Sequence, residues 1–190
     1  MKLGILGGSF NPVHIAHLFI AEEAQARFAL DTVCLMPAFI PPHKMNDQIL
    51  TPQKRLALLH AAVDGTALTI SDFEIAKQGI SYTIDTVRHF AENYDVHLII
   101  GGDSALQFTT WRDYNQIFDY AKVIVFPRNN GTVNDVRSVW GDHFLYCDMP
   151  LLDVSSSDIR ARILEGKPYR WLVPGPVFTL IESERLYRND

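Results

Sequence analysis

The chain has 190 residues, of which 47% are hydrophobic and 21% are charged. This composition is typical of a folded globular protein and excludes a disordered or fibrous chain, and the length is compatible with one domain over residues 1–190. The formal net charge of −5 argues against a general nucleic-acid-binding protein, because proteins that bind a phosphate backbone usually carry a basic stripe. We therefore expect any polyanionic ligand to bind at a local positive site.

Two features bear on the cellular compartment. The chain begins with a strand pattern rather than a signal peptide, and no apolar run approaches the roughly 18 residues that a membrane span requires. Cys34 and Cys147 lie in apolar, strand-like surroundings, where buried reduced thiols are more common than disulfides. We therefore expect a cytoplasmic protein that has no membrane partner.

Short apolar runs rich in Ile, Val and Leu alternate with longer amphipathic stretches along the chain, a pattern typical of β-α-β units. The expected strands are Lys2–Leu6, Thr32–Met36, Leu68–Ser71, His97–Ile100, Val123–Phe126 and Phe144–Cys147. The expected helices cover Val13–Phe28, Pro52–Val63 with Thr51 as N-cap, Thr83–Asn93, and a short segment within Ser104–Tyr120. The pattern predicts an α/β, Rossmann-like, doubly wound and mostly parallel sheet with helices on both faces.

The last part of the chain predicts an added helical piece. In "DVSSSDIRARILEG", three serines can cap a helix that ends at Gly166. "VFTLIESERLY" predicts a final helix after the Val-Pro-Gly-Pro punctuation. By contrast, "AFIPPHKMND" is too rich in proline for regular structure, so we expect a loop after the second strand.

Four polar segments follow four of the expected strands. They are Gly7–His17, Pro41–Lys44, Gly101–Trp111 and Ser155–Arg160. In a doubly wound sheet, ligands bind outside the carboxyl ends of the strands. The sequence therefore predicts that these segments meet at one edge of the sheet.

The first of these segments favours phosphate binding. Gly4-Ile-Leu-Gly7-Gly8-Ser9 does not match the G-x-G-x-x-G dinucleotide motif, the second strand ends in Met36-Pro37 rather than in Asp or Glu, and no P-loop motif occurs. What remains is a glycine turn whose amides can approach phosphate oxygens, followed by a helix N-terminus. His14 and His17 share one face of that helix.

The stretch "GGSFNPVHIAHL" resembles the G-[TS]-F-[DN]-P-x-H-x-G-H-L signature of the nucleotidyltransferase superfamily, and "VSSSDIR" resembles its second signature, I-S-S-T-x-I-R. Within that superfamily, "PPHK", "SYTIDTV" and "GGDSALQFTTW" are similar to bacterial nicotinate-mononucleotide adenylyltransferases. The matches extend from Gly7 to Arg160, nearly the whole chain. One position departs from the pattern: Ala16 stands where H-x-G-H has glycine, and its methyl group could crowd the nucleotide.

The resemblance implies three groups of site residues. ATP is expected to contact Gly7, Gly8, Ser9, Phe10, His17, Gly101, Asp103, Ser155, Ser156 and Arg160. The residues expected to stabilise phosphate charge during the reaction are His14, His17, Lys44 and Arg160. The pyridine ring of the acceptor is expected to stack on Trp111, and its carboxylate to meet backbone amides near Thr83 and Arg112.

The first catalytic candidates also have ordinary structural interpretations. His14 and His17 have the spacing of two metal ligands, but the motif lacks the Glu and the third ligand of a zinc hydrolase, so we expect no protein metal site. They can also be ordinary helix histidines. Lys44 is by default a solvated loop lysine, although its place at the expected ligand edge favours a phosphate clamp.

The later candidates have alternatives as well. Arg160 lies beside a helix start where it can bind phosphate with two parallel hydrogen bonds, or it can pair on the surface with Asp158 or Glu165. Asp103 can cap a helix rather than bind a ribose. Trp111 can belong to the core, although its polar neighbours favour an exposed aromatic platform.

The resemblance implies adenylyl transfer from ATP to nicotinate mononucleotide, with release of pyrophosphate. Mg²⁺ is then expected to arrive with ATP, held mainly by phosphate oxygens and water. Two alternatives stay open: pantetheine-phosphate adenylyltransferase, which shares both signatures, and a nucleotide-sensing module of the same fold that has lost turnover. The expected partners are ATP and the mononucleotide, with a homo-oligomer possible and no nucleic acid.

Overall fold

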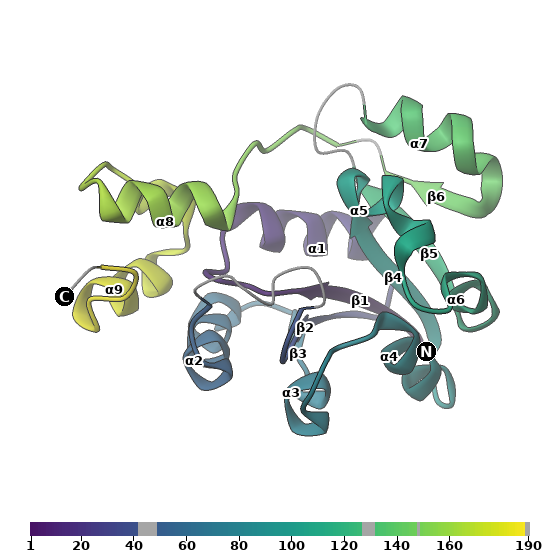
Figure 1. Ribbon diagram of the computed structural model, residues 1–190, viewed down its shortest axis with the longest axis horizontal. Helices are drawn as coiled ribbons and strands as arrows, with labels where there is room; N and C mark the ends of the chain where they lie inside the picture. Colours follow the sequence, from purple (N-terminus) through teal and green to yellow (C-terminus); the bar gives the residue numbers. More distant parts are fainter. Residues whose placement is uncertain (42–48, 127–131, 148, 189–190) are drawn as a thin grey trace.

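The computed structural model describes residues 1–41, 49–126, 132–147 and 149–188, and these form a parallel sheet with helices on both faces (Figure 1). Within these residues the sheet has six strands in the order β3-β2-β1-β4-β5-β6, and every neighbouring pair is parallel. The strands are β1 Lys2–Gly8, β2 Thr32–Pro37, β3 Thr69–Ile70, β4 Asp95–Gly101, β5 Ala121–Phe126 and β6 Phe144–Tyr146. The order reverses between β1 and β4, which is the point where doubly wound sheets bind ligands.

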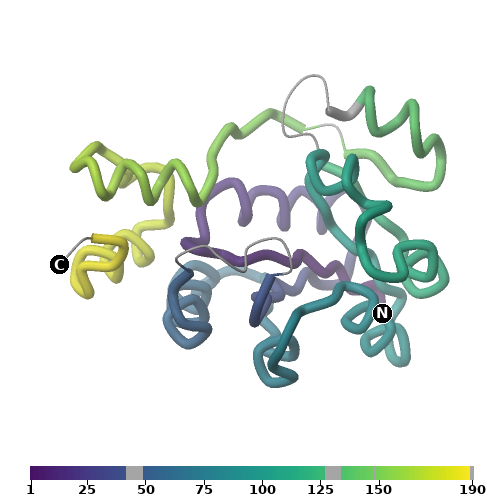
Figure 2. Tube along the Cα trace, viewed as in Figure 1, coloured from purple at the N-terminus to yellow at the C-terminus, as the bar shows by residue number. Residues whose placement is uncertain are grey.

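Nine helices of the described residues surround this sheet. They are α1 Ile15–Arg27, α2 Pro52–Val63, α3 Phe73–Lys77, α4 Thr83–Ala91, α5 Gly102–Leu106, α6 Tyr114–Tyr120, α7 Thr132–Trp140, α8 Ser156–Leu164 and α9 Gly175–Ser183. After β6 the chain runs back past α1 before α8 begins, so α8 and α9 lie together at one end of the molecule (Figure 2).

Alternate strand residues separate two hydrophobic cores. Leu6 of β1 packs with α1, α2, α8 and α9 on one face, whereas Leu3 and Ile5 pack with α4, α5, α6 and α7 on the other. Side chains alternate along a strand, and a sheet covered on both faces therefore reads as a continuous apolar run. This explains why the expected strands were nearly all hydrophobic.

The expected fold class is confirmed, and each expected strand lies within two residues of the observed one. Two helices were missed, α3 and α7. The segment Ser104–Tyr120 holds α5 and α6 rather than one short helix, because a 3-10 turn over Phe108–Thr110 and a left-handed Asp113 (φ 49°) separate them. The last helix ends at Ser183, not at Tyr187, since Arg185 and Tyr187 are also left-handed (φ 51° and 62°).

The predicted helix caps form as expected. Thr51 Oγ1 accepts from the Lys54 backbone N–H at 3.4 Å, and Ser155 Oγ accepts from the Asp158 N–H at 3.0 Å. Helix α8 ends just before Gly166, whose φ of 68° terminates it. Helix α1 begins at Ile15, later than expected, because His14 is extended.

Both cysteines are free and buried, as expected. Burial raises the pKa of the Cys34 thiol to about 11, so this thiol stays protonated at neutral pH. None of the helices that the structure describes is long and apolar enough to cross a membrane. From "AFIPPHKMND", residues 42–47 lie outside the described residues, and the preceding four residues contain only an isolated bridge between Ile40 and Ile80.

Arg55 of α2 is a fully buried cation that no sequence pattern indicated. Its Nη1 donates to the Ser9 carbonyl at 2.8 Å, and its Nε donates to the Leu50 carbonyl at 3.1 Å. Its Nη2 donates to two carbonyls, that of Ala38 at 2.6 Å and that of Phe39 at 3.2 Å. Desolvation lowers the pKa of this guanidinium. One side chain thus joins the ends of β1 and β2 to the start of α2.

We expect Arg55→Met to lower the free energy of unfolding by about 3 kcal/mol or more, because buried carbonyl groups lose their donors. The neighbouring Lys54→Met is the control, since Lys54 is exposed and its ion pair with Glu184 spans 3.9 Å; we expect this substitution to lower the free energy of unfolding by less than about 1 kcal/mol. Urea unfolding of both variants measures the difference. Equal stability of the two would contradict the role of Arg55.

Candidate active site

A pocket of about 440 Å³ opens at the carboxyl ends of β1 and β4. It brings together most of the residues expected from the sequence: Gly7, Gly8, Ser9, His14, His17, Thr83, Gly101, Asp103, Trp111, Ser155 and Ser156. These come from the end of β1, the start of α1, the start of α4, the β4–α5 junction, the loop before α6 and the start of α8. The expected meeting of chain segments at one sheet edge is therefore observed.

The sequence predicted a glycine turn, but Gly7 and Gly8 are the last two residues of strand β1, paired with Met36 and Pro37 of β2, and they leave backbone exposed to the pocket. A Cβ atom built on Gly7 would meet no atom within 4 Å, so this position faces open space. At Gly8 a Cβ would lie 3.2 Å from the ring of Phe10, which is left-handed (φ 46°) and only 1% exposed. Phe10 thus packs beneath Gly8 as part of the core and does not line the pocket.

Hydrogen bonds between the two histidines fix their relative orientation, and in one of them the His17 backbone N–H donates to the His14 carbonyl at 3.0 Å. The His14 N–H donates to His17 Nδ1 at 3.2 Å, and the two rings stack with centroids 3.7 Å apart. An N–H can only donate, so Nδ1 of His17 must accept. A neutral His17 therefore carries its proton on Nε2, which is a hydrogen-bond donor. Phe10 contacts the same ring edge-on at 4.9 Å and limits its rotation.

Helix α8 is fastened to the turn that follows the glycines. Ser156 Oγ donates to the Pro12 carbonyl at 2.8 Å, and Arg160 Nη1 donates to the Asn11 carbonyl at 2.8 Å. These contacts place the N-terminus of α8, with Ser155 and Ser156, at the pocket. The positive end of the α8 dipole and the two glycines at the end of β1 thus lie at one cavity.

Arg160 is half-buried and its side chain does not line the pocket among the described residues. The surface pairs considered for it are not formed, because Asp158 pairs with Arg162 at 3.0 Å and Glu165 with Lys167 at 2.6 Å. Its Nη1 donates to Asn11, and its Nη2 donates to the hydroxyl of Ser157, a lining residue, at 3.4 Å; its contact with phosphate stays a prediction. Lys44 lies outside the described residues.

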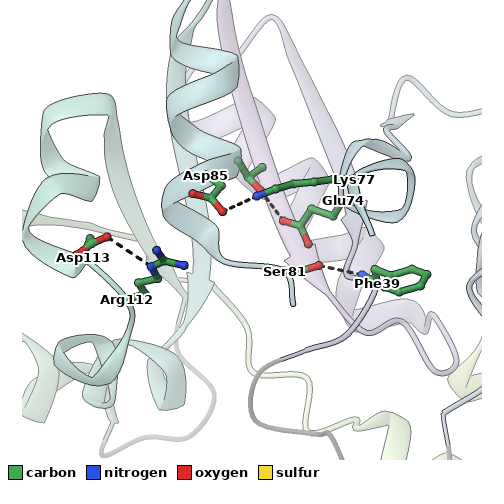
Figure 3. Close-up of polar contacts among 8 residues, drawn as sticks. Phe39, Glu74, Lys77, Ser81, Asp85, Arg112 and Asp113 are labelled. Carbon is green, nitrogen blue, oxygen red and sulfur yellow. Dashed lines mark hydrogen bonds and ion pairs between the residues drawn. The ribbon is translucent and has the colours of Figure 1, made fainter. Parts of the chain in front are cut away.

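Trp111 gives the pocket wall an aromatic side chain. This side chain is half-buried and packs on Phe108 with ring centroids 5.2 Å apart, leaving it at the pocket wall. The guanidinium of Arg112 lies 4.7 Å from the ring of Tyr82, which is the N-cap of α4. Arg112 also pairs with Asp113 at 3.7 Å, as Figure 3 shows, so its side chain connects the Trp111 loop to α4.

Ala16 occupies the glycine position of the first signature and is only 3% exposed. It is not among the residues that line the pocket, so the expected crowding of the nucleotide by its methyl group finds no support in this geometry.

The sequence interpretation missed several lining residues, among them Glu74, Ser104 and Gln107. Ser81 and Thr86, which also line the pocket, lie within the "SYTIDTV" match but received no role. Burial raises the pKa of Glu74, and hydrogen bonds from Thr86 and Ser81 oppose this shift. Among the described residues, no group of three or more His, Cys, Asp and Glu side chains is arranged to hold a metal ion.

Comparisons with known proteins agree with this geometry. Residues 5–162 match the family described as cytidylyltransferase-like. A curated relative from Exiguobacterium sibiricum, named a probable nicotinate-nucleotide adenylyltransferase, is 38% identical over 98% of this chain and 99% of its own. A relative of the same name from Salinibacter ruber is 36% identical over 99% of this chain and 98% of its own.

The fold is similar to solved structures as well. Nicotinic acid mononucleotide adenylyltransferase of Plasmodium falciparum, solved as a complex with NaAD, superposes with a TM-score of 0.84. The similarity covers 98% of this chain and 97% of that one, at 15% sequence identity. At this identity the similarity concerns the fold.

We expect Gly7→Ala to leave the free energy of unfolding within about 1 kcal/mol of the wild type, because the added methyl group meets open space. The same methyl group occupies the space in which a phosphate would approach the backbone, so ATP affinity should fall at least about tenfold. Thermal unfolding and calorimetric titration with ATP measure the two effects. Gly175→Ala, which also adds a methyl group to open space, is the control outside the pocket. Unchanged ATP affinity in Gly7→Ala would refute the binding of phosphate at the Gly7 backbone.

Proposed function

Because the chain belongs to the cytidylyltransferase-like family, and within it to the nicotinate-nucleotide adenylyltransferases, we propose that its pocket transfers the adenylyl group of ATP to nicotinate mononucleotide. The products are nicotinate adenine dinucleotide and pyrophosphate. The observation that carries the proposal is the cavity lined by the two glycines at the end of β1, by His17 with its Nε2–H, by the start of α8 and by Trp111.

The reaction is an in-line substitution at phosphorus. An oxygen of the acceptor's 5′-phosphate attacks the α-phosphorus of ATP, the new P–O bond forms, and the bond to the bridging oxygen of pyrophosphate breaks. Such a transfer requires positioning and charge stabilisation rather than a protein nucleophile. The pocket offers donors of this kind: backbone amides, imidazole N–H and serine hydroxyl groups.

In this proposal His17 is the central catalytic residue. Its Nε2–H donates to an α-phosphate oxygen and stabilises the charge that develops there. Nδ1 is held by the His14 N–H, so the donor keeps its tautomer and direction throughout the reaction. His14 contributes a second imidazole to the same oxygens, and Lys44 and Arg160 add positive charge.

The rest of ATP extends along the two glycine-containing strand ends. Gly7, Gly8, Ser9, Ser155 and Ser156 surround the phosphates, and Gly101 and Asp103 meet the adenosine, with the carboxylate on the ribose hydroxyl groups. The acceptor's pyridine ring stacks on Trp111, and its carboxylate accepts from backbone N–H groups near Thr83 and Arg112.

We propose that Mg²⁺ enters with ATP. The groups placed around the phosphates above are hydrogen-bond donors, and they are not the oxygen cage that a dedicated Mg²⁺ site needs. The ion would therefore be held by phosphate oxygens and water, and would offset part of their negative charge. A cytoplasmic location, a possible homo-oligomer and a single domain over the whole chain stay predictions.

Pyrophosphate release is the direct test of the proposed function. The wild type is incubated with ATP, Mg²⁺ and either nicotinate mononucleotide or phosphopantetheine, and pyrophosphate is measured. We expect pyrophosphate release when the acceptor is nicotinate mononucleotide and none when it is phosphopantetheine. Release only with phosphopantetheine would assign the alternative transferase activity, and ATP binding without any release would indicate a nucleotide-sensing module.

We expect His17→Ala to lower kcat by on the order of 10²-fold, because it removes one preorganised donor from the transition state. His60→Ala is the control, since His60 is an exposed residue of α2 outside the pocket. Steady-state kinetics on folded protein, checked by circular dichroism, measure the effect. Unchanged kcat in His17→Ala would remove this residue from the mechanism.

We expect the wild type to prefer nicotinate over nicotinamide mononucleotide by about tenfold to several-hundredfold in kcat/KM. Both oxygens of a carboxylate accept from N–H groups, whereas an amide turns its NH₂ toward one of them and leaves a donor unpaired, at about 1–3 kcal/mol. Trp111→Ala should raise the KM of both acceptors and keep most of their ratio. Trp171→Ala is the control, because Trp171 is 82% exposed and outside the pocket. Equal use of both acceptors by the wild type would contradict the carboxylate subsite.

A further inference from the structure

Glu74 places a carboxylate in the wall of a pocket that is proposed to bind anions. It lies on α3, and it lines the pocket together with Ser81, Thr83 and Thr86. A carboxylate next to an anionic acceptor would repel it, and partial burial adds a desolvation cost. The presence of this group therefore needs a purpose other than contact with the substrate.

The contacts of Glu74 give that purpose. Its Oε1 accepts from the buried Thr86 hydroxyl at 2.6 Å. Ser81 Oγ accepts from the Phe39 N–H at 2.9 Å, so its own hydroxyl proton is available to another acceptor. The Ser81 hydroxyl lies close enough to Glu74 to lower the pKa of this carboxyl. Ser81 and Thr86 thus place two hydroxyl groups beside one carboxylate, and Figure 3 shows the Phe39–Ser81 hydrogen bond next to Glu74.

The residues around Glu74 flank the segment that begins α4. Thr86 follows Thr83 by three residues and is hydrogen-bonded to Glu74, and Ser81 precedes Thr83 by two residues and is hydrogen-bonded to Phe39. The Ser81 N–H also donates to the Ile40 carbonyl at 3.1 Å, which fixes the segment to the loop after β2. These contacts fix the orientation of the backbone at the start of α4, and therefore of its N–H groups, relative to the pocket.

We propose that Glu74 is a positioning residue for the acceptor subsite: it holds residues 81–86 so that their backbone N–H groups face the ring carboxylate of the acceptor. The proposal rests on the proposed function. A carboxylate suits this role because it offers two acceptor oxygens to two hydroxyl donors at once, and bonds to a charged acceptor are stronger than neutral ones. Glu74 itself donates nothing to the substrate.

The nearby charges do not replace Glu74. Lys77 of α3 forms an ion pair with Asp85 of α4 (Figure 3), and both side chains are partly exposed. This pair links the same two helices but neither residue lines the pocket. Lys77 is therefore a matched control: Lys77→Met removes a contact between α3 and α4 while it leaves the hydrogen bonds of Glu74 in place.

The first measurement needs no substrate. Amide hydrogen exchange is followed over residues 79–86 in the wild type and in Glu74→Ala, Glu74→Gln, Thr86→Val and Lys77→Met. We expect exchange in this segment to be at least about tenfold faster in Glu74→Ala, intermediate in Glu74→Gln and Thr86→Val, and unchanged in Lys77→Met. Unchanged exchange in Glu74→Ala would overturn the proposal, even if the enzyme is active.

The second measurement separates positioning from a general structural role. In Glu74→Ala we expect the KM of nicotinate mononucleotide to rise about tenfold, the KM of ATP to stay within about twofold, and the preference over nicotinamide mononucleotide to fall. An equal rise of both KM values, or an unchanged preference, would overturn the proposal. If Glu74→Ala does not fold, Glu74→Gln and Thr86→Val decide it. Failure of the wild type to release pyrophosphate would instead refute the proposed function, and the exchange result would stand apart from it.

Discussion

The Arg55 guanidinium donates to carbonyl groups at the ends of two parallel strands, and two of those carbonyls belong to Ser9 and Ala38, which line the pocket. Loops cannot bury carbonyl groups without donors, because each unpaired acceptor is costly. A planar cation with five N–H groups satisfies several of them from one place. The segments of Ser9 and Ala38 therefore hold their places in the pocket lining although they have no regular secondary structure.

The hydrogen bonds of Ser81 complement those of Arg55 at the loop after β2. The Arg55 guanidinium donates to the Phe39 carbonyl, whereas Ser81 Oγ accepts from the Phe39 N–H. This loop is thus held by Arg55 of α2 and by Ser81, which lies just before α4. Asn11, in the turn after β1, is likewise held by two segments. Its carbonyl accepts from Arg160 of α8, and its Oδ1 accepts from the Leu50 N–H at 3.2 Å.

Local sequence predicted what depends on periodicity and short motifs. The strands were recognisable as apolar runs, and Thr51 and Ser155 as caps. Gly7, Gly8 and His17 were predicted to share one site and they line one pocket, while their binding of phosphate stays a prediction. Glu74 and Arg55 were not recognisable, because their partners lie up to 46 residues away and only folding brings them together. Helix α3 has five residues, too few for a helical period to appear. The fold was therefore more predictable than the polar network that shapes its pocket.

The hydrogen bonds from α8 to the first turn have a consequence for synthesis of the chain. Ser156 and Arg160 reach back across 144 and 149 residues to Pro12 and Asn11. A ribosome makes Gly7, Gly8 and both histidines first, and makes α8, which completes the pocket lining, about 140 residues later. A nascent chain shorter than about residue 160 therefore holds the first signature without the complete pocket, and the pocket can form only after α8 has been made and has folded back onto the first turn.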